Sequence, residues 1–138
     1  MRTPTPALVL MLALALAGSA VPALADPGER EIEIYHIAPG QHAAFLRFVA
    51  LLDEANARAG LPPRQLYVHE DGASWDFLLI QPNEVTPEQS KALDAAYKAL
   101  KIPQGGKFFV AIRQFIVEHT DTVATGPTTA AEWLKKLD

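Results

Sequence analysis

Apolar and polar residues alternate in several separate stretches of the chain, and these stretches predict four β-strands. In the first, Ile32 and Ile34 alternate with Glu33 and Tyr35, which is the two-residue period of a half-buried strand. The third stretch is apolar on both faces, so we expect it near the centre of a sheet. The predicted strands run from Glu31 to Ile37, from Arg64 to His69, from Ser74 to Gln81 and from His119 to Thr125.

Apolar residues at helical spacing predict four helices between and after these strands. The first ends before Gly60, because a glycine followed by prolines stops a helix. Thr86 and Gln89 have the spacing of a capping box at the start of the second. For the third, a strand over Phe108 to Val117 is the open alternative. The predicted helices run from Gln41 to Ala59, from Thr86 to near Lys101, from Phe108 to Ile116 and from Ala130 to Leu137.

This order of elements predicts an α+β fold of the ferredoxin-like, split βαβ type. In that plan the strands lie across an antiparallel sheet in the order fourth, first, third, second. The helices cover one face of the sheet, and the prediction includes extra C-terminal helices. On the first strand we expect Ile32, Ile34 and His36 to face the core. The opposite face, with Glu33, Tyr35 and Tyr67, would then line a ligand cavity or form a dimer surface.

Short segments at the strand ends make the chain resemble the dimeric α/β-barrel superfamily, near small exported members of unassigned function. These segments are 35–40 (Tyr-His-Ile-Ala-Pro-Gly), 67–69 (Tyr-Val-His), 74–77 (Ser-Trp-Asp-Phe) and 119–122 (His-Thr-Asp-Thr). The resemblance covers most of Glu31 to Thr125. It implies a homodimer whose two sheets pair into a barrel, with substrates or haem held between sheet and helices. Activities in the superfamily are diverse, so the resemblance does not select a reaction.

Met1 to Ala25 has the layout of a secretory signal peptide. A basic residue, an unbroken apolar run and an Ala-x-Ala cleavage site ending at Ala25 follow one another. The alternative is a membrane anchor, but Gly18 and Pro22 interrupt the apolar stretch and no basic cluster follows it. We therefore expect an exported protein, periplasmic or secreted, with one domain over 26–138 and no membrane association after cleavage.

Composition narrows the choice of partners and chemistry. The 138 residues include 12 Lys or Arg and 16 Asp or Glu, and the basic residues are dispersed. A formal net charge of −4 without a basic patch argues against nucleic acid as a partner. The chain has no cysteine, which excludes thiolate metal sites and cysteine nucleophiles. It also lacks a glycine-rich phosphate loop and a His-Glu-x-x-His helix, and no cofactor is identified.

The predicted topology brings polar candidate residues to one end of the sheet. The first and second strands finish where the third and fourth begin, and adjacent strands lie about 4.8 Å apart. The candidates for catalysis are His36, His119 and Asp121. The candidates for ligand binding are Tyr35, Tyr67, His69, Trp75 and Asp76. This grouping follows from topology and not from a sequence motif.

Each candidate also has a purely structural interpretation. His36 is equally well explained as a hydrogen-bonded core histidine, and Trp75 as a core residue. A carboxylate inside an apolar strand needs a partner, so Asp76 is also expected as a capping or turn acceptor. His119 and Asp121 could form a local pair that fixes the fourth strand. His36, His119 and Asp121 could supply three metal ligands, although no short ligand spacing is present, and any of these histidines could bind haem.

Three functions remain open at this stage. The first is a homodimer that binds a small organic ligand beside the histidine-rich end of the sheet. The second is an oxygenase-like enzyme, cofactor-free or dependent on haem or a metal. In that enzyme His36 or His119 acts as a general base oriented by Asp76 or Asp121. The third is an interaction module that uses the sheet only for dimerisation.

Overall fold

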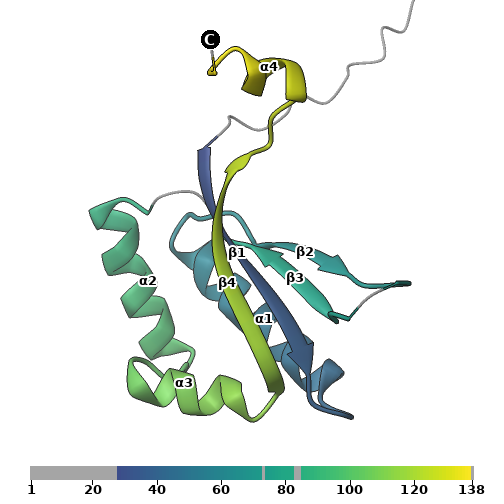
Figure 1. Cartoon of the computed structure of the whole chain (residues 1–138). Helices are drawn as coiled ribbons and strands as arrows, with labels where there is room; N and C mark the ends of the chain where they lie inside the picture. The colour runs from purple at the N-terminus through teal and green to yellow at the C-terminus, as the bar shows by residue number, and fades with distance from the viewer. Residues whose placement is uncertain (1–27, 73, 83–84, 138) are drawn as a thin grey trace, which may run out of the picture.

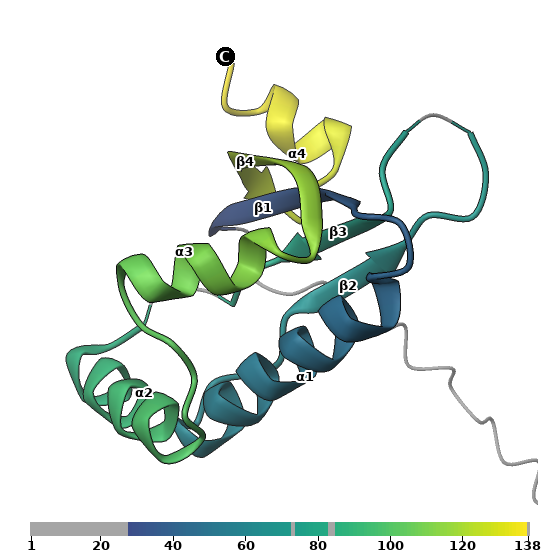
Figure 2. The same ribbon diagram turned by 90° about the horizontal axis from the view of Figure 1, so that it is seen from below.

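A four-stranded antiparallel sheet forms one layer of the protein, and helices cover one of its faces (Figures 1 and 2). The computed structural model describes residues 28–72, 74–82 and 85–137. The predicted signal peptide therefore lies outside the described residues. The strands are β1 (Gly28–Ile37), β2 (Gln65–Val68), β3 (Phe77–Ile80) and β4 (Ile116–Gly126). The helices are α1 (His42–Arg58), α2 (Pro87–Ala99), α3 (Gly106–Arg113) and α4 (Ala130–Leu134).

The sheet order is β2-β3-β1-β4, with every neighbouring pair antiparallel. This confirms the predicted order, the α+β class and the ferredoxin-like arrangement. It also confirms that the third strand is internal. Helices α1, α2 and α3 lie on one side of the sheet, called here the helix face, and the opposite side is called the open face (Figure 2).

The core forms between the helix face and α1. Phe45 of α1 is completely buried. Its ring stacks on Phe77 of β3 at 5.5 Å and lies 4.9 Å from the ring of Tyr35 on β1. A second buried cluster joins Leu52 of α1 to Ala96 of α2. The core therefore fixes which side of β1 points toward the helices.

That side is not the one predicted from the sequence. Tyr35 and Ile37 are buried in the core, whereas Ile32, Ile34 and His36 lie on the open face. The alternation of residues predicts a strand but not which of its two sides faces the core, because both sides of β1 carry bulky apolar or aromatic side chains. The aromatic packing of Tyr35 against Phe45 decides the orientation.

Tyr35 and Tyr67 consequently do not share a face, which corrects the predicted polar–aromatic surface. Tyr67 of β2 is in register with Leu78 of β3, and Leu78 is in register with Ile34 of β1. All three lie on the open face. Tyr67 is half exposed there.

Other differences concern the limits of elements. The third helix ends at Arg113, so Ile116, predicted to be helical, begins β4 instead. Its apolar side chain still packs against the core, which explains why the spacing resembled a helix. β3 begins at Phe77 and not at Ser74, and α4 ends at Leu134. Trp75, expected as a core residue, is only partly buried and lies outside both core clusters.

Two predicted helix boundaries are confirmed with their physical causes. Gly60 follows α1 with φ of +72°, a left-handed conformation that glycine adopts without steric cost. At the start of α2, the Thr86 hydroxyl accepts a hydrogen bond from the backbone of Gln89, whose side chain accepts one from the backbone of Thr86. Among the described residues, no helix combines the length and apolar character that crossing a membrane would require.

Candidate functional site

Four polar side chains from β1 and β4 meet on the helix face. Glu33 is in register with Asp121, and Tyr35 is in register with His119. Because each strand alternates its side chains, all four point to the same side. We call Glu33, Tyr35, His119 and Asp121 the acid–imidazole cluster. The imidazole of His119 stacks on the ring of Tyr35 at a centroid distance of 5.8 Å.

The cluster has a buried half on β1 and an accessible half on β4. Tyr35 is only 4% exposed, whereas the side chains of His119 and Asp121 are 33% and 47% exposed. The Nε2 atom of His119 lies 3.5 Å from Oδ2 of Asp121. A molecule approaching the edge strand can therefore reach the imidazole and the carboxylate from solvent, with the phenol and the second acid behind them.

In the buried half of the cluster, the pKa values of both titratable side chains are raised. Burial raises the pKa of Glu33, and hydrogen bonds from the Tyr35 hydroxyl and the Gln81 side chain offset this rise only in part. Burial also raises the pKa of the Tyr35 phenol, and the neighbouring charge of Glu33 adds to the effect. Because the single O–H of Tyr35 is donated to Glu33, a protonated Glu33 carboxyl is the donor that this pair can offer a ligand, while His119 and Asp121 offer acceptors.

A cavity of about 280 Å³ lies on the helix face beyond Glu33, and the four cluster residues are not among those that line it. Gln81 lines the cavity and also hydrogen-bonds to Glu33. Arg64 lines it too, and its Nη1 atom pairs with Oδ1 of Asp53 at 3.0 Å. The positive charge of Arg64 acts on Glu33 as well. Two residues thus connect the cavity to the acid–imidazole cluster.

Asp76 has a structural partner on each carboxylate oxygen. Its Oδ2 accepts a hydrogen bond from the backbone N–H of Ile37 at 2.7 Å, and its Oδ1 lies 3.1 Å from Nε2 of His42. The hydrogen bond from Ile37 lowers the pKa of Asp76, and the interaction with His42 contributes to the same shift. This is the acceptor role that the sequence left as an alternative for Asp76. His42 was not predicted as a partner; the signal that could have identified it is its place at the start of α1, just beyond the end of β1.

The remaining predicted site residues lie elsewhere. His36 is on the open face, in register with Glu118, and is therefore separated from His119 by the sheet. His69 and Trp75 lie together beside the β2–β3 connection, with ring centroids 5.0 Å apart. The structure thus brings Tyr35, His119 and Asp121 together but places the other predicted residues around the same end of the sheet.

The open face has a hollow of its own. A cavity of about 220 Å³ is lined by Ile32 and Ile80 from the inner strands and by Tyr67 and Gln65 from β2. Thr125 to Pro127 close its far side. Its lining is mainly apolar, so it differs in character from the helix-face cavity.

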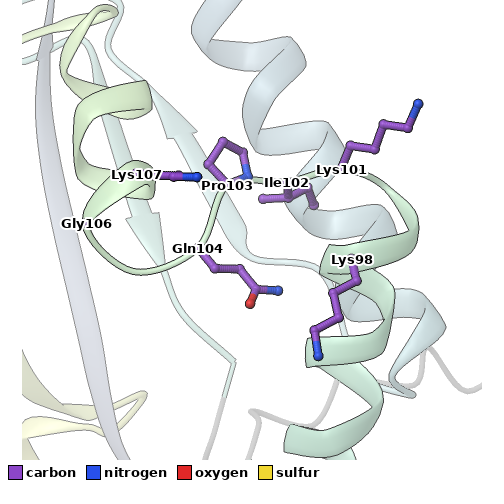
Figure 3. Close-up of a pocket in the computed structure, with 7 residues that line it drawn as sticks. All are labelled: Lys98, Lys101, Ile102, Pro103, Gln104, Gly106 and Lys107. Atoms are coloured by element: carbon purple, nitrogen blue, oxygen red, sulfur yellow. The ribbon is translucent and has the colours of Figure 1, made fainter.

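A third, larger hollow of about 810 Å³ lies between the end of α2 and the start of α3. Lys98, Lys101 and Lys107 line it, but Figure 3 shows that their side chains point in three different directions. They do not converge on a common point that an anion could occupy. Within the described parts of the chain, no three histidine, aspartate or glutamate residues are grouped to hold a metal ion.

Comparison with known proteins does not identify an activity. No protein-family model matches the chain, and no curated protein matches it. A crystal structure of a protein from Agrobacterium tumefaciens is similar with a TM-score of 0.47 and 17% identity, over 75% of this chain and 96% of that chain. An uncharacterized NIPSNAP domain protein from Burkholderia xenovorans has a TM-score of 0.40 and 13% identity, over 75% and 97%.

A third similar structure comes from Bacteroides fragilis. It is described as a dimeric protein of unknown function with a ferredoxin-like fold, and has a TM-score of 0.39 and 11% identity over 71% of this chain and 95% of that chain. Similarities this low carry no argument about function. The ferredoxin-like assignment of this chain rests on its own strand order and helix placement.

Proposed function

We propose that this protein is an exported homodimer that binds a small organic ligand on the helix face. The observation that carries the ligand proposal is the acid–imidazole cluster, in which a phenol, an imidazole and two carboxyl groups from adjacent strands share one side of the sheet. A cavity of about 280 Å³, close to the lower size limit of small-molecule sites, is linked to the cluster through Gln81 and Arg64, which line it and interact with Glu33. Export is supported by the signal-like sequence of the first 25 residues.

The ligand proposal is tested by screening small carbonyl-containing and phenolic compounds for thermal stabilisation of the protein. A ligand at a concentration 100 times its Kd stabilises the folded state by about 2.7 kcal/mol. We expect His119→Ala and Glu33→Gln to weaken binding of a hit at least tenfold. His69→Ala, which removes a histidine from the β2–β3 connection, is the matched control and should bind normally. Equal binding by all three variants would contradict the proposed site.

A specific observation favours an enzymatic version of this function. The Nε2 atom of His119 faces the Asp121 carboxylate at 3.5 Å, an arrangement in which a carboxylate can orient an imidazole as a general base. A protonated Glu33 carboxyl would then supply a hydrogen-bond donor to the same substrate, with the Tyr35 hydroxyl bonded to that carboxyl. Turnover of a screening hit that is lost in His119→Ala but retained in His69→Ala would establish the enzyme over the simple binding protein.

The homodimer proposal rests on the open face. Four strands about 4.8 Å apart, with β1 extending over ten residues, give a flat area on the order of 500 Å². Its centre carries the apolar side chains Ile32, Ile34, Leu78 and Ile80. Such an area approaches the roughly 800 Å² per partner that a standard stable interface buries.

Sedimentation velocity tests this interface. A charge placed at the centre of the face, as in Ile34→Asp, should convert a dimer into a monomer, because a buried unpaired carboxylate is strongly unfavourable. Val110→Asp on α3, where the side chain is 75% exposed, is the control and should leave the dimer intact. A wild-type protein that sediments as a monomer at all concentrations would refute the proposed dimer.

A further inference from the structure

The C-terminal segment leaves the sheet on the side opposite the other helices. After β4 the chain bends at Gly126 and Pro127 and forms α4. Figure 2 shows α4 beyond the open face, whereas α1, α2 and α3 lie across the helix face. Figure 1 shows it past the end of the strands. The two views together place the segment past the ends of the strands, on the side of the open face.

The apolar side chains of this segment are partly uncovered, and the Nζ atom of Lys136 lies 4.8 Å from the centroid of the Trp133 ring. Trp133 is 42% exposed, Leu134 is 59% exposed and Leu137 is 71% exposed. Trp133 and Leu134 lie in α4, and Leu137 follows in a turn in which its backbone N–H donates to the carbonyl of Leu134. Within α4 no residue is buried. The segment thus presents an apolar surface that its own domain, as far as the structure describes it, leaves open.

The short length of α4 also calls for a packing partner. A helix of five residues is not stable in water on helix propensity alone. The conformational entropy lost in forming the first turn exceeds the stabilisation from its few hydrogen bonds. Its start is fixed by a capping box between Thr129 and Glu132, with hydrogen bonds of 3.1 and 3.2 Å. The capping box satisfies the first backbone groups but covers none of the apolar side chains. Burial of Trp133 and its neighbours would supply the missing stabilisation.

We propose that the apolar side of α4 packs against the open face of a second copy of the chain. This inference rests on the proposed homodimer and adds the C-terminal segment to its interface. The sheet face alone offers a flat area on the order of 500 Å², somewhat less than a standard interface uses per partner. The exposed apolar side chains of α4 extend that area. Thr125 and Gly126 at the end of β4, and Pro127 after them, line the open-face cavity, so the chain enters the C-terminal segment from the edge of that face.

Tryptophan fluorescence tests the contact directly, because the chain contains only two tryptophans. In a full-length Trp75→Phe variant, Trp133 is the single reporter. We expect its emission to shift to longer wavelength on dilution, over the same concentration range in which sedimentation shows the dimer dissociating. A dimer that dissociates while Trp133 emission stays constant would overturn the proposal and leave the sheet-to-sheet dimer standing. A chain that never dimerises would overturn both.

Substitution provides a second test that does not depend on the reporter. Trp133→Ala should weaken the dimer roughly 30-fold, as expected for a tryptophan at the centre of a contact. Val110→Ala changes an apolar side chain that is 75% exposed on α3, a helix of the helix face, and should leave the dimer dissociation constant unchanged. Circular dichroism of both variants confirms that they fold. An unchanged dissociation constant for Trp133→Ala would show that α4 lies outside the interface.

Discussion

Single residues on β1 determine how the two faces of the sheet differ. Tyr35 packs its ring into the core against Phe45, yet its hydroxyl donates a hydrogen bond to Glu33. The phenol therefore links the apolar core to the acid–imidazole cluster. Glu33 is held in a half-buried position in which its neutral form is favoured, and this makes it the residue whose titration reports on the site.

The raised pKa of Glu33 predicts a specific pH dependence of stability. The folded protein retains a proton on Glu33 at pH values where the unfolded chain, with an ordinary pKa of 4.5, has released it. The free energy of unfolding should therefore decrease as the pH rises from 4.5 to the raised pKa. In Glu33→Gln this decrease should be absent. Urea denaturation between pH 4 and pH 8 measures it.

The control for this experiment is Glu29→Gln, which changes an exposed glutamate on the same strand. It should retain the wild-type pH dependence. An identical profile for Glu33→Gln and the wild type would show that the carboxyl group is not held in the environment described.

Asp76 predicts the opposite dependence. Its pKa is lowered in the folded state, so its stabilising contribution is complete above its ordinary value of 3.8 and disappears as the pH falls through the lowered value. At pH 7, Asp76→Asn should reduce the free energy of unfolding by about 1 kcal/mol, since a partly exposed charged hydrogen bond becomes a neutral one. The difference from the wild type should vanish in strong acid. A difference that persists unchanged at pH 2 would contradict this account.

At the scale of elements, the sequence predicted best those features that depend on contacts between residues close together in the chain. The start of α2 is one example, because Thr86 and Gln89 satisfy each other's backbone groups without help from the rest of the fold. The inward face of β1 is the counterexample. Whether Ile34 or Tyr35 is buried depends on where Phe45 packs. The alternation of residues along the strand carries no information about that contact.

The same local contact gives a prediction for α2. Thr86→Ala removes the hydroxyl that accepts the Gln89 N–H and should lower the free energy of unfolding by about 1 kcal/mol. Thr86→Ser keeps the acceptor and should have little effect. Chemical denaturation of both variants distinguishes capping from a general effect of the position. Equal destabilisation by alanine and serine would rule out the capping contribution.

At the scale of the whole molecule, topology predicted the neighbourhood of the site but not its composition. The strand order brought β1 and β4 together, as expected, and with them Tyr35, His119 and Asp121. It did not reveal that His36 points to the other face, because that depends on the orientation of β1. The involvement of Gln81 and Arg64 depends on tertiary packing between the sheet, α1 and α2, which no local pattern encodes.

The two faces of the sheet suggest a division of roles. The helix face carries polar, titratable groups beside a cavity, and the open face is apolar at its centre. A ligand site on one side and a partner on the other would leave both accessible at the same time. In this account dimerisation and ligand binding are separable, so a monomeric Ile34→Asp variant that remains folded should still bind the ligand.

The most direct measurement of the central claim is nuclear magnetic resonance of the histidine side chains during titration with a stabilising ligand. The chain has four histidines, so the assigned imidazole signals compare the acid–imidazole cluster with other parts of the structure. The account predicts that the His119 signals shift with saturation while those of His69 remain in place. Shifts confined to His69, or to His36 on the open face, would contradict a ligand site on the helix face.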